Sequence, residues 1–437
     1  MRAMKDSGIE WIGQVPESWE SRSLKYALDA HSGGAWGSNE GGDETDVICV
    51  RVADFDYAKL SVDFHDKMTV RSYTEKAIAE SSLKHGDILL EKSGGGEVTP
   101  VGRSVLFTGE EGMMCANFIE WLRPNQYFNS CFLNYWLAAA YINGFSKRNV
   151  KQTTGIQNLD IPAFLSEKIV APSVIEQKQI AQYLDEKCTE IDALIAAKEK
   201  TNTLLKERRQ SIIYEAVTKG LNPDAPMKDS GIEWIGEIPE HWEVERLKHH
   251  IEFNPKTDIP EYGEDDSVSF IPMDCLRRGV HTSQTVDYSK VKSGYVDFAE
   301  GDILMAKVTP CLENGNLAIA GNLIDGVGFG STEINVIRCK SIHREYLFYI
   351  LQCKTYVDRA VADMYGVAGL KRLNPSFIPN TKYPMPSIEE QQKIAEYLAA
   401  TCGEIDELVV ANERTIEKLK EYRQSVIYEA VTGKIEV

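Results

Sequence analysis

The chain contains one ten-residue stretch twice: Met4-Lys5-Asp6-Ser7-Gly8-Ile9-Glu10-Trp11-Ile12-Gly13 recurs unchanged as residues 227–236. The offset of 223 residues continues through two Pro-Glu-x-Trp-Glu motifs, which begin at Pro16 and Pro239. A second repeat, with an offset of 214 residues, relates 209–218 to 423–432 and differs only where Ile212 becomes Val426. Self-similarity at so long a period indicates that the chain is an internal duplication.

Between the repeated segments the two copies have diverged. Gly86-Asp87-Ile88-Leu89 still matches 301–304, but most other side chains differ. Each insert alternates strand-like runs with turns and has one amphipathic helix, so a mixed α/β class is expected. We expect strands at Asp46–Val52, Asp87–Leu90 and Phe118–Leu122, and the helices at Phe132–Tyr141 and Tyr346–Gln352.

Two long helices follow the inserts. Residues 174–219 contain neither Pro nor Gly, begin with a Ser173-x-x-Glu176 capping box and stop at Gly220. The second helix opens with Ser387 and is expected to run to the C-terminus. Three-and-four spacing gives each helix an apolar seam, typical of a coiled coil. The predicted seams are Ile180, Leu184, Cys188, Ile191, Leu194 or Ile195, Leu205 and Ile212, and Ile394, Leu398, Ile405, Leu408 and Leu419.

At 1.5 Å per residue the first helix makes a rod of roughly 65 Å, longer than one compact domain needs. Packing of the two helices within one chain is expected, because both are already tethered. A coiled coil between two chains is the alternative. The repeated Trp-Ile-Gly segments are expected to pack on a helix end, with a functional aromatic pocket as the other interpretation.

Length and composition further limit the classes of protein to which the chain can belong. The 437 residues, 43% hydrophobic and 26% charged, predict two or three soluble domains. Apolar runs are too short to span a membrane, and no export signal opens the chain, so a cytoplasmic protein is expected. Nine cysteines without a Cys-x-x-Cys pair suggest reduced thiols, and the eight histidines lack zinc-ligand spacing, so no metal site is expected.

Charge and motifs argue against an independent enzyme. Lys and Arg number 48 against 66 Asp and Glu, a formal charge of −18, which opposes free-standing nucleic-acid binding. Gly94-Gly95-Gly96 lacks the Gly-Lys-Ser/Thr ending of a phosphate loop. Asn254-Pro255-Lys256 departs from the Asn-Pro-Pro-aromatic motif of adenine methyltransferases. No catalytic residue is therefore expected.

Basic and amide-rich segments are the candidates for DNA contact. They lie in the loops after the Gly-Asp-Ile-Leu strands and just before the long helices, and such side chains reach base edges and phosphates. For any one residue, a solvated loop is the alternative. The candidates are Lys92, Ser93, Arg103, Lys147, Arg148, Lys151, Thr154, Gln157, Lys307, Thr309, Asn314, Lys371, Arg372 and Asn374.

The repeated frame resembles the specificity subunits of Type I restriction-modification systems. The motifs that carry the resemblance are 8–13 with Pro16 and Trp19, Glu176-Gln177 with Ile180-Ala181, and their second copies at 231–242 and 390–395. The resemblance implies two target-recognition domains related by a pseudo-twofold axis and separated by two antiparallel coiled-coil helices. It divides the chain at 1–172, 173–220, 221–386 and 387–437.

The resemblance also implies a function. Each domain would read one half of an interrupted site on double-stranded DNA, with half-sites roughly 34 Å apart. Two methyltransferase subunits and further restriction subunits would act on the DNA. S-adenosylmethionine, ATP and Mg would bind to those partners, and no cofactor to this chain. Tyr214, Glu215, Tyr428 and Glu429 would serve methyltransferase docking or internal packing.

A rival interpretation is a two-domain coiled-coil scaffold that binds proteins and never touches DNA. The acidic composition favours this rival. Two inserts that diverge within a retained frame are better explained by the reading of two different DNA targets.

Overall fold

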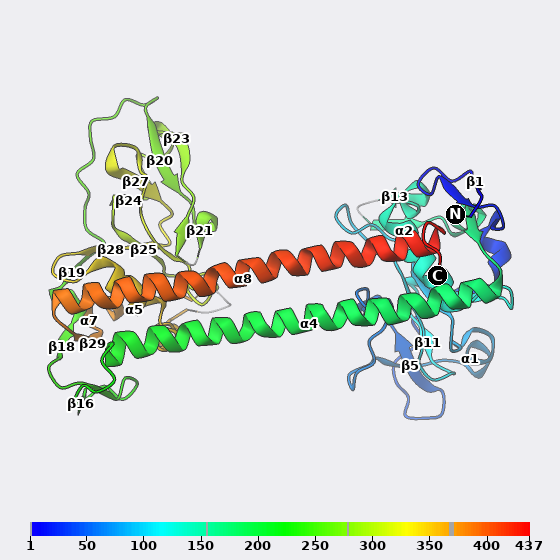
Figure 1. Ribbon diagram of the computed structural model, residues 1–437, viewed down its shortest axis with the longest axis horizontal. Helices are drawn as coiled ribbons and strands as arrows, with labels where there is room; N and C mark the ends of the chain where they lie inside the picture. The colour runs from blue at the N-terminus through cyan, green and yellow to red at the C-terminus, as the bar shows by residue number, and fades with distance from the viewer. Residues whose placement is uncertain (1, 154–155, 278, 367–370) are drawn as a thin grey trace. The chain divides into compact units, whose positions relative to one another are not determined.

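The computed structural model describes residues 2–153, 156–277, 279–366 and 371–437. The chain forms two compact units: unit 1 comprises 1–198 and 414–437, and unit 2 comprises 199–413. Figure 1 shows strands and helices in both units and two long helices, so the mixed α/β prediction is confirmed. Each long helix contributes residues to both units.

Unit 1 is built on a six-stranded, mainly antiparallel sheet. Its order is β4 (Leu28–Gly33), β12 (Ile119–Pro124), β9 (Ile88–Glu91), β10 (Ser104–Leu106), β7 (Ser61–Val62) and β6 (Phe55–Asp56). A three-stranded sheet has the order β11 (Met114–Cys115), β5 (Asp46–Val50) and β8 (Val70–Ser72). The three strands expected in this insert are thus present as β5, β9 and β12, with ends shifted by one or two residues.

The repeated segments and short helices surround this sheet. β1 (Met4–Asp6) pairs with β2 (Gln14–Pro16), β3 (Glu20–Ser23) with β15 (Lys168–Ala171), and β13 (Val150–Thr153) with β14 (Ile156–Leu159). The helices are α1 (Glu75–Ser81), α2 (Ser130–Ile142) and α3 (Ile161–Ser166). Side chains of α2 share one core with the carboxyl end of the last helix of the chain, beside which α2 lies in Figure 1.

Unit 2 repeats the plan with different strands. One sheet has the order β19 (Ile251–Phe253), β28 (Ile334–Cys339), β25 (Ile303–Ala306) and β26 (Leu317–Ile319). A second has the order β23 (Gln284–Asp287), β20 (Ser267–Ile271), β27 (Val327–Gly330) and β24 (Val296–Ala299). The smaller pairs are β16 (Met227–Asp229) with β17 (Glu237–Pro239), β18 (Glu243–Arg246) with β29 (Lys382–Met385), and β21 (Leu276–Arg277) with β22 (Val280–His281).

The prediction of one helix per insert is wrong. Unit 2 has α5 (Arg344–Gln352), α6 (Lys354–Ala362) and α7 (Phe377–Asn380), and unit 1 has α1 and α3 in addition to α2. α5 and α6 are separated only by Cys353, whose extended backbone (φ −61°, ψ 127°) breaks the helical path. α1, α3 and α7, of seven, six and four residues, span too few turns to produce a readable apolar period.

The Gly-Asp-Ile-Leu repeat forms the same structure in both units. Gly86 has a φ of +91° and its counterpart in unit 2 a φ of +87°, a region that glycine enters without strain. Asp87 pairs with Arg123 at 2.7 Å, and Asp302 pairs with Arg338 at 2.7 Å. Both carboxylates are almost fully buried, and each arginine comes from the strand beside its partner's strand. The repeat therefore fixes one turn and one strand pairing in each unit.

The first long helix, α4 (Val174–Lys219), has the predicted ends. The second, α8 (Ile388–Val431), stops before the C-terminus, contrary to expectation. The chain turns at Gly433, where φ is +69°. The capping serines behave as predicted: Ser173 accepts the Glu176 N–H, and its equivalent in α8 does the same.

Within each unit the two long helices run antiparallel. In unit 1, Ile191 and Ile195 pack with Ile416. In unit 2, Asn412 Nδ2 donates to Asn202 Oδ1 at 2.9 Å. The two long helices thus contact each other within one chain.

Parts of the predicted seams face elsewhere. Ile180, Leu184 and Cys188 join the core of the globular part of unit 1. Leu194 is 54% exposed while Ile195 is buried, and Leu408 is 55% exposed. The burial of Leu408 was therefore predicted wrongly; the adjacent Val409 is buried instead. Two adjacent apolar residues satisfy a period between 3.5 and 3.6 equally well, so spacing alone does not choose between them.

No described helix is both long and apolar enough to cross a membrane. All nine cysteines are free thiols, and five of them are buried.

Candidate nucleic-acid interface

In unit 1, the loop after β9 is bonded to the β13–β14 hairpin. The Leu159 N–H donates to the Lys92 carbonyl at 2.8 Å, and Ser93 Oγ donates to Asn158 Oδ1 at 2.5 Å. Gln157, which is 7% exposed, accepts the Val101 N–H through Oε1 at 3.3 Å. We call residues 92–101, 150–153 and 156–159 the unit 1 loop surface. Gln157 points inward and shapes this surface.

Unit 2 has an equivalent arrangement. The Leu373 N–H donates to the Lys307 carbonyl at 2.8 Å. The Thr309 N–H donates to the Lys371 carbonyl at 3.1 Å, and Thr309 Oγ1 accepts the Lys371 N–H at 3.0 Å. Residues 307–316 and 371–374 form the unit 2 loop surface. In each unit, segments that the sequence singled out separately are therefore brought together.

Two exposed cations on these surfaces are paired with carboxylates. Lys151, 72% exposed, pairs with Asp160 at 2.5 Å, and this contact lowers the pKa of Asp160. Arg372, 58% exposed, pairs with Glu333. Exposed pairs of this kind are weak, so a phosphate can replace the carboxylate at low cost.

Two predicted residues face the interior. Lys92 Nζ donates to Glu120 at 3.0 Å and is 23% exposed. Arg103 donates to Glu91 at 3.1 Å, and its guanidinium lies 3.6 Å from the centroid of the Tyr57 ring. Both side chains contact carboxylates of the central strands β12 and β9 beneath the loop.

Of the remaining candidates, five belong to the unit 2 loop surface, and Lys147 and Arg148 lie just before β13. Lys147, Lys371 and Asn314 are exposed. Arg148 pairs with Glu10 at 2.8 Å, on the amino-terminal segment. Other positions are as follows: Asn374 accepts the Ser376 N–H, Lys307 and Thr309 are half-buried, and Thr154 lies outside the described residues.

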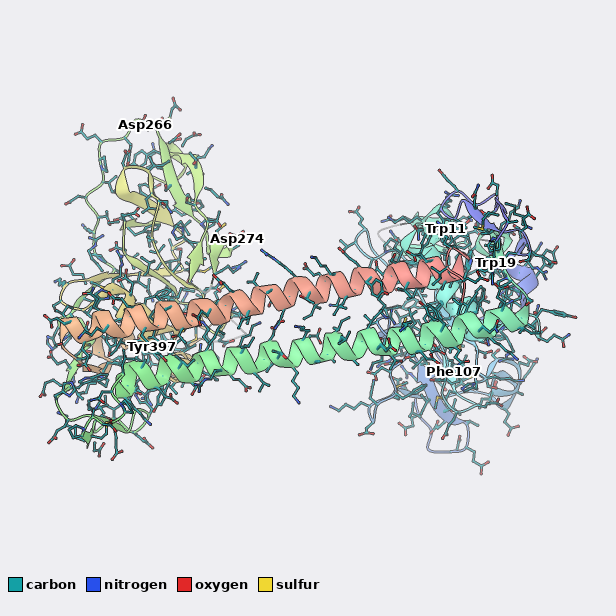
Figure 2. All side chains as sticks on the ribbon, viewed as in Figure 1. Trp11, Trp19, Phe107, Asp266, Asp274 and Tyr397 are labelled. Atoms are coloured by element: carbon teal, nitrogen blue, oxygen red, sulfur yellow. The ribbon has the colours of Figure 1, made fainter. Side chains whose placement is uncertain are left out.

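The four predicted interface residues lie at the carboxyl ends of the long helices. Tyr214 donates to the Ile235 carbonyl at 3.0 Å, and Tyr428 to the Trp11 carbonyl at 3.1 Å. Glu215 and Glu429 each accept a hydrogen bond from the serine one turn earlier. Both tyrosines thus pack internally, and each Trp-Ile-Gly segment docks on a helix end as predicted. Figure 2 shows Trp11 beside the carboxyl end of α8.

Sequence reasoning missed the acidic partners of the basic candidates. Glu120 and Glu333 lie far along the chain from Lys92 and Arg372, and no spacing rule connects them. It also missed Gln177 and Gln391, which anchor the long helices, although both lie within a repeated motif. No group of acidic, His or Cys side chains among the described residues is placed to hold a metal ion.

Residues 239–418 match the family model described as Type I restriction modification DNA specificity domain. Among curated relatives, the MjaVIII specificity subunit of Methanocaldococcus jannaschii is 25% identical over 87% of this chain and 86% of its own length. The putative MjaX specificity subunit of the same organism is 26% identical over 98% and 96%. The Escherichia coli EcoAI specificity subunit is 35% identical over 39% of this chain, but only 30% of that relative is spanned.

Solved structures show the same fold. A chain from a study of complex assembly and conformational transition of the type I R-M system has a TM-score of 0.71 at 15% identity, covering 96% of this chain and 99% of its own. The HsdS subunit of Thermoanaerobacter tengcongensis has a TM-score of 0.53 at 15% identity, covering 96% and 98%. Over residues 239–418 this chain thus matches a DNA specificity domain, along most of its length it is similar to curated specificity subunits, and it has the fold of the two solved structures.

Proposed function

We propose that this chain is the non-catalytic DNA-recognition subunit of a Type I restriction-modification complex, in which each unit reads one half of a bipartite site. The observation that carries the proposal is the pair of loop surfaces. Each follows the Gly-Asp-Ile-Leu strand and precedes the long helix of its copy, yet the two carry different side chains. Two surfaces that recognise different DNA sequences need the same position in each unit but different side chains.

The acidic composition agrees with this role when partners are present. On the loop surfaces, Lys151 and Arg372 are held by carboxylates of the same unit, which reduces the positive charge that these surfaces offer to phosphates. In this proposal, two methyltransferase subunits supply the remaining phosphate contacts and the adenine-N6 methylation. Restriction subunits supply cleavage, and S-adenosylmethionine, ATP and Mg belong to these partners.

The test is an exchange of inserts. Residues 28–160 are replaced by the corresponding insert of another specificity subunit, and methylome sequencing of cells that carry the complex reads the modified motif. One half of the motif is expected to change while the other stays. The matched control exchanges 251–374 and should change only the opposite half. If both halves change after one exchange, the two units do not read independently.

A gel shift separates DNA recognition from the scaffold alternative. The chain together with a methyltransferase subunit should retard an oligonucleotide carrying the motif. The scaffold role predicts no retardation in either the presence or the absence of that subunit.

A further inference from the structure

Arg71 differs from the other arginines of residues 1–198 in what it contacts. There are seven arginines in this range, and six of them form an ion pair with a carboxylate. Arg71, in β8, forms no ion pair with any residue that the structure describes. Its guanidinium lies 4.2 Å from the centroid of the Trp36 ring, which is 40% exposed, and Nη1 donates to Asn39 Oδ1 at 2.6 Å. We call these three residues the Arg71 cluster.

Backbone contacts hold the loop of Trp36 against the strand of Arg71. Ser38 and Ser72 exchange backbone hydrogen bonds at 2.9 and 3.2 Å, which join the loop to β8. Gly37 has a φ of +68°, and a Cβ there would lie 2.8 Å from the Ser72 carbonyl oxygen, so the loop needs glycine at this position. The aromatic ring and the guanidinium thus project from two segments that are bonded to each other.

The Arg71 cluster adjoins the unit 1 loop surface. The Gly34 N–H, at the start of the loop that carries Trp36, donates to the Ile119 carbonyl at 2.9 Å. The Lys92 N–H, at the start of the loop surface, donates to the Phe118 carbonyl at 2.9 Å. Both segments are therefore bonded to the same short turn, so DNA bound on the loop surface lies close to the cluster.

The cluster presents hydrogen-bond donors. A guanidinium can only donate, so the Asn39 amide turns Oδ1 towards Arg71 and keeps Nδ2, a donor, for other groups. Arg71 Nη2 forms no hydrogen bond with any described residue. In the major groove guanine presents two acceptors, N7 and O6, whereas adenine and cytosine each present a donor. A set of donors on this surface therefore suits guanine.

We propose that Arg71 is a specificity-determining residue of unit 1, which donates to O6 and N7 of one guanine, with Trp36 and Asn39 as its positioning residues. This inference rests on the proposed function. Arginine offers a planar pair of donors, and a ring on one face with an amide at one end restricts the orientation of that pair. A contact with phosphate would carry no sequence information and would need no such restraint.

Unit 2 has no donor at the equivalent position. β5 and β20 have five residues each and pair with β8 and β23 respectively. Arg71 lies opposite Val47, the second residue of β5, and Val286 lies opposite Val268, the second residue of β20. Because valine cannot donate, this recognition of guanine belongs to one half of the site, as two units with unlike targets require.

The test measures binding of the full chain, in complex with its methyltransferase subunit, to duplex oligonucleotides. These carry the motif found by methylome sequencing of the wild type, with one G·C pair at a time replaced by A·T in the half that the insert exchange assigns to unit 1. Arg71→Met keeps apolar contact with the ring but removes the donors. It should lose about fivefold to a hundredfold of discrimination at one position and none elsewhere. Lys67→Ala, which removes an exposed cation from the segment before β8, is the matched control and should keep all discrimination.

Two further variants separate recognition from folding. Trp36→Phe keeps an aromatic face and should lose less discrimination than Arg71→Met, at the same position. Hydrogen exchange of the Ser38 and Ser72 amides shows whether each variant keeps the loop on β8. If Arg71→Met releases the loop, Arg71→Lys replaces it; lysine keeps the charge without the planar donor pair and should lose discrimination at that position too.

Unchanged discrimination at every position by a folded variant of Arg71 would overturn the assignment. Uniformly weaker binding to all oligonucleotides would also overturn it, since that result indicates a phosphate contact. A unit 1 half-site without any G·C pair would do the same. Failure of the wild-type complex to bind any of the oligonucleotides would instead overturn the proposed function.

Discussion

Replacement of Gln177 by leucine removes the anchor between the first long helix and the globular part of unit 1. The side chain is 1% exposed, and Oε1 accepts the Asn129 N–H at 2.8 Å. Nε2 donates to the carbonyls of Pro172 at 3.0 Å and Tyr127 at 3.1 Å. Each buried backbone group left without a partner costs about 1–3 kcal/mol. Water can reach the Tyr127 side, so the total loss is about 3–5 kcal/mol.

The second copy supplies an internal comparison. Gln391 accepts the His343 N–H at 2.8 Å and donates to the Pro386 carbonyl at 2.9 Å, which makes two bonds instead of three. Gln391→Leu should therefore cost about 2–4 kcal/mol, less than Gln177→Leu.

Native-state hydrogen exchange measures both effects locally. A loss of 3 kcal/mol accelerates exchange at the Asn129 amide by more than about a hundredfold, since every 1.36 kcal/mol is tenfold. Gln182→Leu and Gln392→Leu are the controls, because both side chains are exposed on the same helices and bond only to a glutamate one turn later. The reasoning is refuted if Gln177→Leu exchanges no faster than Gln182→Leu, or if Gln391→Leu has the larger effect.

Three further perturbations test the fold. Gly86→Ala places a side chain at a position with positive φ and should lower the free energy of unfolding, measured with urea, by about 1–3 kcal/mol. Gly403→Ala, in open space within α8, should raise it by about 0.5–1 kcal/mol. A change of the same sign for both substitutions would contradict this prediction. Burial lowers the pKa of His281 below its ordinary value of 6.5. Between these two pKa values the unfolded chain binds more protons than the folded chain, so the urea midpoint of unit 2 should fall as the pH drops below 6.5. His281→Gln should flatten this pH dependence. Asn202→Leu should destabilise the helix pair by about 1–2 kcal/mol, because it leaves the Asn412 amide without this hydrogen-bond partner. Addition of Asn412→Leu should recover that loss. A double-mutant cycle in which the two losses simply add would contradict this prediction.

The long helices were predictable because their signals are local. A capping serine, an uninterrupted run without Pro or Gly, and a terminal glycine define α4 without reference to any other part of the chain. The choice between Leu194 and Ile195 was not predictable in the same way. That choice depends on what the helix packs against, and several of its apolar residues pack on the globular part of unit 1 instead of the partner helix.

The loop surfaces were predictable only as segments. Basic and amide residues singled out these stretches of chain, and the hydrogen bonds show that the stretches meet in each unit. The direction of individual side chains depended on acidic residues such as Glu120, far away in sequence, that turn Lys92 inward. Which of the side chains contact DNA stays a prediction.

The carboxyl end of α8 closes the core of unit 1, where Ile427 and Val431 lie among side chains from the first half of the chain. Gly433 approaches so near to Pro16 that a methyl group there would lie 2.5 Å from the proline ring. Unit 2 is a continuous stretch, 199–413, whereas unit 1 is built from 1–198 together with 414–437. During synthesis on the ribosome, residues 1–198 must therefore wait until the whole of unit 2 has been made before residues 414–437 can complete their core.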